Sequence, residues 1–248
     1  MTDQVVGVDG CKVGWLAVSI TSDGKLSSRI SLTIQNLWET YAHAHMILMD
    51  VPIGLSENGT RICDQEARRL LGHPRGSSVF PVPCRAAVYA QTYEEACLIN
   101  QAHTGRRLSK QTWGIVPKIR EVDTFLQRTP QARSILREIH PEVCFYTLNG
   151  ASMVHSKRTV PGFRERIGVL RCYYPSIEQF ITEAYKQLGQ MGWALDDLVD
   201  ATAAAITGWD GAGQLVTLPQ DPPPDMLGLP MEIVYRKRDS TVTIHFRA

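Results

Sequence analysis

The chain lacks several features that would place it in a class at once. Its six cysteines are far apart, and none forms a CxxC pair or a Cys/His group with zinc spacing. We therefore expect free thiols in a reducing compartment. No apolar run approaches the roughly 20 residues of a membrane helix, and the N-terminus has no signal-peptide pattern. These absences predict a cytoplasmic protein with no membrane partner.

Net charge is almost absent as well, but the charges are unevenly distributed. The 26 basic and 25 acidic residues leave +1 over 248 residues. Residues 61–171 hold 18 Lys/Arg and 9 Asp/Glu, whereas residues 1–60 hold 3 and 6 and residues 172–248 hold 5 and 10. A basic middle segment favours a positive face suited to phosphates. Charges spread over a solvated surface are the alternative.

What the first part of the chain does contain is a pattern of strands. Apolar and alternating runs predict strands at 4–9, 13–21 and 27–34, joined as an antiparallel meander with an Asp-Gly turn between the last two. A short helix follows, for which we expect Asn36 as the cap and Glu39 as its capping-box partner. The apolar run "MILM" then predicts an interior strand that ends at an acid.

The remainder is mainly helical, with a few short strands. We expect helices at 61–72, 93–103, 116–128, 141–150, 176–190 and 194–209, and strands at 134–140, 213–218, 231–237 and 241–246, the last two forming a hairpin. This order predicts an α/β fold with one mixed sheet, three antiparallel strands followed by parallel ones. We expect a single domain, 1–248, with a mainly helical basic insertion at about 61–130 and short C-terminal strands at about 213–246.

Acidic residues lie where several of these elements begin or end. Asp9 and Asp50 each come at the end of a predicted strand, and a parallel pairing of the two strands would make them neighbours. Asp197 and Asp200 share one helix face, and the alanines after them would let that helix pack tightly on the sheet. Glu142 follows another strand end. Each acid has an ordinary alternative as a turn or cap residue, for example Asp197 at the N-terminus of its helix.

Carboxylates that converge on one point need a cation, and oxygen ligands suit Mg²⁺ or Mn²⁺. We therefore consider Asp9, Asp50, Asp197 and Asp200 as metal ligands, and Asp9, Asp50, Glu142 and Asp200 as catalytic residues. Such a site can activate water for phosphodiester cleavage without a serine or cysteine nucleophile.

Basic residues supply candidates for holding the substrate's phosphates. These candidates are Lys12, Arg85, Lys118, Arg120 and Lys157. Internal ion pairing is the alternative, for instance of Lys118 with Glu121 or Asp123. His140 is a candidate general base or a hydrogen-bonded, half-buried histidine, and Trp113 is a candidate for base stacking or for packing.

Five ordered motifs add a resemblance to a known family. They are "GVDGCKVGW", "MDVPIGL", "SSVFPVPCRAAVYAQTYEEA", "LSKQTWGIVPKIREVD" and "EIHPEVCFYTLNG". Together they resemble the domain of unknown function 429 family, described as predicted RNase H-like nucleases, over residues 5–210. The resemblance implies an RNase H-like fold, with acids where Asp9, Asp50 and Asp197 or Asp200 stand. The glutamate that cellular RNases H carry on the first core helix has no counterpart, since Glu39 lies too early; Glu142 is the candidate substitute.

These observations lead to three hypotheses on function. The first is a metal-dependent nuclease that acts on a nucleic acid, DNA or RNA. The second is an ATP-dependent phosphotransferase related to sugar kinases and actin-like ATPases, with Lys12 near the phosphates, although that superfamily normally has two copies of the core. The third is a non-catalytic binding module in which the acids form ordinary salt bridges. The oligomeric state stays open, with a homo-oligomer among the options.

Overall fold

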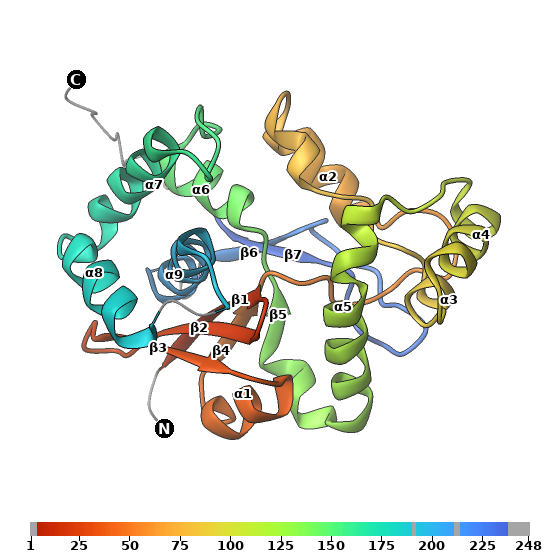
Figure 1. Cartoon of the computed structure of the whole chain (residues 1–248), viewed down its shortest axis with the longest axis horizontal. Helices are drawn as coiled ribbons and strands as arrows, with labels where there is room; N and C mark the ends of the chain where they lie inside the picture. Colours follow the sequence, from red (N-terminus) through yellow and green to blue (C-terminus); the bar gives the residue numbers. More distant parts are fainter. Residues whose placement is uncertain (1–3, 190–191, 211–213, 238–248) are drawn as a thin grey trace.

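The main element of the structure, a computed structural model that describes residues 4–189, 192–210 and 214–237, is a five-stranded mixed sheet. Its strands are β1 (Val5–Cys11), β2 (Gly14–Ile20), β3 (Leu26–Ser31), β4 (Met46–Met49) and β5 (Leu136–Glu138), arranged in the order β3-β2-β1-β4-β5 (Figure 1). β1, β2 and β3 pair antiparallel, whereas β4 is parallel to both β1 and β5. The predicted mixed α/β class is confirmed, and this strand order is consistent with an RNase H-like core.

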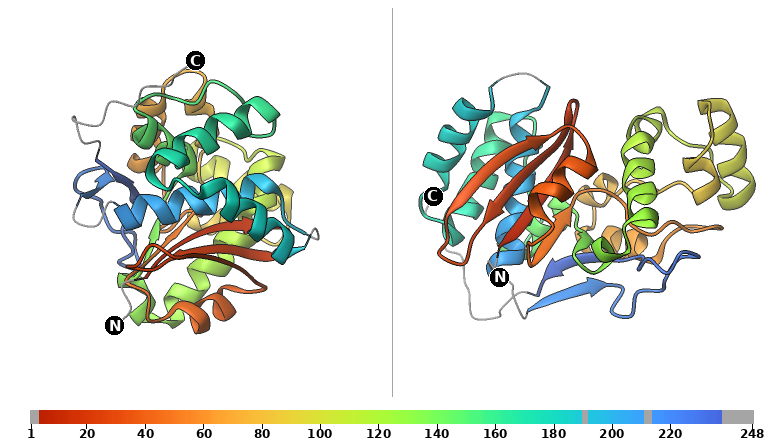
Figure 2. Two further views of the ribbon diagram at one scale, coloured as in Figure 1. Left: turned by 90° about the vertical axis from the view of Figure 1, so that its left-hand side faces the viewer. Right: turned by 90° about the horizontal axis from the view of Figure 1, so that it is seen from below.

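Helices cover both faces of the sheet. They are α1 (Ile34–Tyr41), α2 (Ile62–Leu71), α3 (Arg85–Val88), α4 (Tyr93–Thr104), α5 (Lys110–Arg128), α6 (Pro141–Asn149), α7 (Val160–Tyr173), α8 (Ile177–Leu188) and α9 (Leu195–Asp210), with short 3₁₀ turns at Arg75–Ser78 and Pro130–Ser134. Figure 2 shows α9 and α8 on one side of the strands and α1 and α5 on the other. A separate two-stranded sheet joins β6 (Leu215–Leu218) and β7 (Ile233–Arg236).

The alternation of side chains along β1 separates two apolar cores. Val6 and Val8 point into the core that α1 and α5 cover, whereas Val5 points into the core that contains α6 to α9. Since side chains two apart share a face, Asp9 lies on the Val5 side, where its cross-strand partner Leu16 is also buried. The sequence of β1 therefore aims the Asp9 carboxylate towards α9.

Close packing of α9 on the sheet depends on a missing side chain. A Cβ atom at Gly7 would lie 2.1 Å from the carbonyl oxygen of Ala201 and 2.3 Å from the amide nitrogen of Ala205. Glycine in the strand and alanine in the helix thus allow the two backbones to approach. This approach brings Asp200, the residue before Ala201, to the strand that carries Asp9.

Several boundaries differ from the predicted ones for local reasons. The helix α7 was not predicted, because Pro161, Gly162 and Gly168 interrupt its pattern; Thr159 caps it, and proline is well tolerated in a first turn. The helix α5 begins at Lys110, six residues earlier than expected, and continues through Pro117.

The cap of the first helix differs from the expected one, and the expected C-terminal hairpin lies partly outside the described residues. The helix α1 is capped by Thr33, which accepts a hydrogen bond from the Asn36 amide, so Asn36 is not the cap. β7 pairs with β6. The strand expected at 241–246 lies outside the described residues. Among the described helices, none combines the length and the apolar character that a bilayer crossing requires.

Candidate functional site

Three aspartates from separate elements meet at one edge of the sheet and form what we call the acid cluster: Asp9, Asp50 and Asp200. Asp9 lies near the end of β1, and the Asp50 amide directly after β4 donates to the Val8 carbonyl at 2.8 Å. The predicted parallel pairing of β1 and β4 is confirmed and places these two acids side by side. Asp200 is 2% exposed and comes from the face of α9 that packs on β1.

One cation lies among these acids. The Nζ atom of Lys157 donates to Oδ2 of Asp200 at 2.5 Å and lies 3.6 Å from Oδ2 of Asp196. Lys157 belongs to the segment between α6 and α7, and this segment can pack against α7 only because Gly162 has no side chain: a Cβ there would lie 1.9 Å from the Ser156 carbonyl oxygen. The local sequence thus holds the lysine at the acid cluster.

Burial and mutual repulsion make the cluster hard to ionise fully. Burial, followed by the charges of Asp50 and Asp200, raises the pKa of Asp9 well above its ordinary value. Burial raises the pKa of Asp50 to about 6 and that of Asp200 to about 6, although Lys157 opposes both shifts. Burial alone would lower the pKa of Lys157, but Asp200, Asp9 and Asp50 raise it above its usual value. The cluster therefore holds more negative charge than one lysine compensates.

A pocket of about 450 Å³ opens onto this cluster. Asp50, Asp200 and Lys157 line it together with His140 and Glu142. The Oε1 atom of Glu142 accepts from Arg166, but its Oε2 atom is buried without a hydrogen-bond partner among the described residues, as is the Nδ1 atom of His140. Burial lowers the pKa of His140, which favours its neutral form. Unused polar atoms of this kind are expected where a ligand binds.

The donor set suits a hard cation, although it is not closed around one. In the parts of the chain that the structure describes, no three His, Cys, Asp or Glu side chains are grouped closely enough to hold a metal ion. The ammonium group of Lys157 lies among the carboxylates instead. Carboxylate oxygens are the ligands that Mg²⁺ and Mn²⁺ prefer, but in this arrangement they face the Lys157 ammonium, which a metal ion would have to displace.

Asp197, the other acid of α9 that was predicted as a metal ligand, has a structural contact. Oδ2 of Asp197 accepts from the Ala194 amide at 2.8 Å, which ties the carboxylate to the first turn of the helix. Burial raises the pKa of Asp197, and its charge raises the pKa of Asp50 and of Asp9. Asp197 therefore lies near the acid cluster, while its side chain also caps α9.

Two of the predicted phosphate ligands are engaged elsewhere. The guanidinium of Arg85 bonds Asp123, Asp225 and Glu57, so all of its charge is met by carboxylates. Arg120 donates to the carbonyls of Val88 at 2.8 Å and Ala90 at 2.7 Å. These contacts favour the internal-pairing alternative for Arg85 and a structural role for Arg120.

The two lysines near β1 differ in their surroundings. The Nζ atom of Lys118 donates to the Gly14 carbonyl at 2.6 Å and lies 4.2 Å from the centre of the Trp15 ring. It is also 3.9 Å from Glu121, the partner expected for it. Lys12, in the turn between β1 and β2, is exposed. Trp113 packs against Tyr93 with 6.1 Å between ring centres, in line with the packing alternative.

Sequence reasoning missed two groups of residues here. Arg166, 1% exposed, was not considered because it lies on the unpredicted helix α7. Arg68 and Arg106, which line a second pocket, were counted only within the basic middle segment. A charge count over that segment was the available signal, but it does not say which cations share a cavity.

The geometry defines the class of the protein: an α/β protein with a β3-β2-β1-β4-β5 sheet, with buried acids on β1 and α9 and a half-buried acid directly after β4. A family model described as "Protein of unknown function (DUF429)" matches residues 7–224, and the chain belongs to this family. No curated protein and no solved structure shows a significant match to the chain.

Proposed function

We propose that the protein is a nuclease that cleaves phosphodiester bonds with the help of a divalent metal held by Asp9, Asp50 and Asp200, with Glu142 beside them. The observation that supports this most strongly is the acid cluster itself, in which three carboxylates from three elements share a single lysine; Asp9 and Asp200 are buried, and Asp50 is half-buried. Fold stability gives no reason to assemble such a cluster, because buried like charges are costly. A binding site for a cation gives one.

The residues of the chain have separate tasks in this proposal. The carboxylates of the acid cluster bind the metal, which, when bound, polarises the scissile phosphate and activates a water molecule. Lys157, at the same pocket, stabilises negative charge on the phosphate. His140 lines the same pocket, and burial lowers its pKa and favours its neutral form, so its imidazole is the group that accepts the proton of the attacking water.

The test is a cleavage assay on labelled DNA and RNA, single-stranded and duplex, with Mg²⁺, Mn²⁺ or EDTA. We expect cleavage with either metal and none in EDTA. Asp9→Asn and Asp50→Asn should each lower the rate at least about a hundredfold, since even residues that only orient metal ligands are worth about 10–100-fold. Asp221→Asn, an exposed aspartate outside the site, is the matched control. Unchanged cleavage in Asp9→Asn would refute the proposal.

One observation favours a second candidate, the non-catalytic binding module. Lys157 already pairs with Asp200, as an ordinary salt bridge would. This candidate predicts no cleavage with any metal and no change in melting temperature when Mn²⁺ is added. A rise in melting temperature with Mn²⁺ that is lost in Asp9→Asn would exclude it.

The phosphotransferase hypothesis receives less support. It calls for two copies of the core, and the described residues contain one five-stranded sheet of this topology next to the small β6–β7 sheet. We therefore do not propose it as the function.

A further inference from the structure

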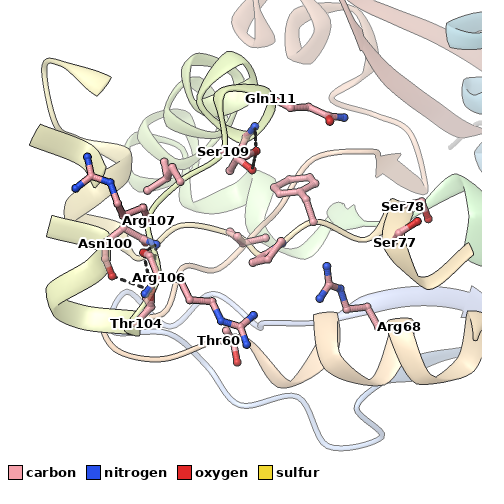
Figure 3. Close-up of a pocket in the computed structure, with 15 residues that line it drawn as sticks. Thr60, Arg68, Ser77, Ser78, Asn100, Thr104, Arg106, Arg107, Ser109 and Gln111 are labelled. Atoms are coloured by element: carbon pink, nitrogen blue, oxygen red, sulfur yellow. Dashed lines mark hydrogen bonds between the residues drawn. The ribbon is translucent and has the colours of Figure 1, made fainter. Parts of the chain in front are cut away.

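A second pocket, of about 310 Å³, lies beside the site, and we call it the arginine pocket. Arg68 of α2 and Arg106 of the turn after α4 line it, together with Thr60. Figure 3 shows Arg68 and Arg106 reaching into the space from opposite sides, whereas the guanidinium of Arg107 is turned away from it. Two cations from distant parts of the sequence therefore face one cavity.

Within the part of the chain that the structure describes, no carboxylate pairs with either of these cations. Arg68 donates through Nε to the Val79 carbonyl at 2.6 Å, which fixes the side chain and leaves its two terminal nitrogens without a partner among the described residues. The Arg106 side chain has no hydrogen bond or ion pair within the same residues. No Asp or Glu is among the residues that line the arginine pocket. Asp64 lines an adjoining pocket, but both of its oxygens bond Arg61.

The arginine pocket is continuous with the pocket at the acid cluster. Both are lined by Ser78, Phe80, Gln111 and Thr112. Phe80 is half-buried, so part of its ring is open to a ligand between the two pockets. Aromatic rings stack unpaired bases, and paired guanidinium groups bind phosphate oxygens. The order along the surface is acid cluster, aromatic ring, arginines.

We propose that the arginine pocket binds a phosphate group of a nucleic-acid strand whose scissile phosphate lies at the acid cluster. Phe80 stacks an unpaired base between these two phosphates, so the substrate is single-stranded at this position. The inference rests on the proposed function for the place of the scissile phosphate, but binding in the arginine pocket requires neither metal nor cleavage. The phosphate is either the end of a strand or an internal phosphodiester.

The experiment measures binding rather than cleavage. Single-stranded DNA and RNA of about 12 nucleotides, within the usual site size of such proteins, carry a 3′ fluorescein and either a 5′ phosphate or a 5′ hydroxyl. Their dissociation constants are measured by fluorescence anisotropy in EDTA at several salt concentrations. Arg106→Gln is compared with Arg69→Gln, an exposed arginine on α2 that does not line the pocket. The double variant Arg68→Gln/Arg106→Gln is compared with Arg69→Gln/Arg128→Gln.

We expect Arg106→Gln to weaken binding about tenfold, the effect of losing a charge-assisted hydrogen bond, and the double variant to weaken it further. The plot of log affinity against log salt concentration should become less steep, by about 0.7 in slope, when one phosphate contact on a single strand is lost. The control variants should lose much less binding affinity. Melting temperatures should stay unchanged for Arg106→Gln, because its side chain is exposed.

Each outcome decides between named possibilities. Weaker binding only of the 5′-phosphorylated strand identifies a terminal phosphate, and weaker binding of both strands identifies an internal one; both support the inference. Equal losses in variants and controls, or no binding by the unaltered protein, would overturn it. If binding responds as expected but no metal supports cleavage, the proposed nuclease activity fails while the arginine pocket stands.

Discussion

Two buried charge clusters of the protein, the acid cluster and one around Arg61, are built in opposite ways. Arg61, 1% exposed, bonds Asp64 at 2.6 Å and Glu138 at 2.7 Å, and also donates to the carbonyls of Ile53 and Gly54. In this second cluster, two carboxylates are met by a planar cation with several fixed donors. In the acid cluster, three carboxylates share one flexible lysine, and Glu142 keeps an oxygen without a partner.

The difference separates charges whose partners are fixed by the fold from charges that are only partly paired within the described residues. A buried ion pair with all its donors used stabilises the structure only as long as both partners remain. In the acid cluster the lysine ammonium bonds only Asp200 among the three aspartates, so the carboxylates of Asp9 and Asp50 lie near it without a fixed donor from this cation. Burial alone does not distinguish the two, because Asp64 and Asp200 are 4% and 2% exposed. The two clusters differ in the number of hydrogen-bond donors that face each carboxylate.

The largest effect is expected at the Arg61 cluster. Arg61→Met leaves Asp64 and Glu138 buried without a cation, which should cost about 3–5 kcal/mol of unfolding free energy. Urea denaturation measures the loss, with the exposed Arg69→Gln as control. Arg61→Lys retains the charge and should lose less. A loss below about 1 kcal/mol in Arg61→Met would show that the cluster does not hold the fold.

A substitution in the acid cluster should act in the opposite direction. Asp9→Asn removes a carboxyl group whose pKa is raised by burial and then by the charges of Asp50 and Asp200, so the metal-free protein should gain unfolding free energy at pH 8. The same denaturation experiment measures it, with Asp221→Asn as the neutral control. If Asp9→Asn destabilised the protein as Arg61→Met does, both clusters would stabilise the fold, which would contradict the difference between them.

The pH dependence of stability gives a smaller effect with a defined sign. Since the pKa of Asp50 rises from 3.8 to about 6 on folding, the folded state binds the proton more tightly. Its contribution to stability is therefore complete below pH 4 and is lost as pH rises to about 7. Burial raises the pKa of Glu138 to about 7, so its contribution to stability is also lost as the pH rises. In Asp50→Asn the fall in unfolding free energy between pH 4 and 7 should be about 2 kcal/mol shallower than in the unaltered protein; an identical pH profile would contradict the raised pKa.

The smallest effect is expected on cation affinity. Lys157 competes with a metal ion for the acid cluster, so Lys157→Gln should tighten Mn²⁺ binding several-fold, within the typical range of about 0.5–1.5 kcal/mol for one net polar contact. Calorimetric titration of Mn²⁺ measures the change, and Lys186→Gln, an exposed lysine on α8, serves as control. Weaker binding in Lys157→Gln would mean that the lysine helps to organise the site.

The fold could be predicted from the sequence where local patterns are strong. The alternating apolar runs and the interior "MILM" strand predicted the order of the strands in the sheet. This order correctly placed Asp9 and Asp50 next to each other. The helix α7 could not be predicted, since proline and glycine hide it, and with it the contact that holds Lys157 near Asp200 was missed. The sequence analysis named Arg85 as a candidate phosphate ligand and counted Arg106 only within the basic middle segment. Only tertiary packing shows that carboxylates surround Arg85 while Arg106 lines an open pocket.

The central claim is that the acid cluster binds a divalent cation, and anomalous diffraction from a Mn²⁺-soaked crystal tests it most directly. The account predicts an anomalous peak within ligand distance of the Asp9, Asp50 and Asp200 carboxylates, with the Nζ atom of Lys157 moved away from Oδ2 of Asp200. An anomalous map without a peak at these carboxylates, and with the Lys157–Asp200 pair intact, would contradict it.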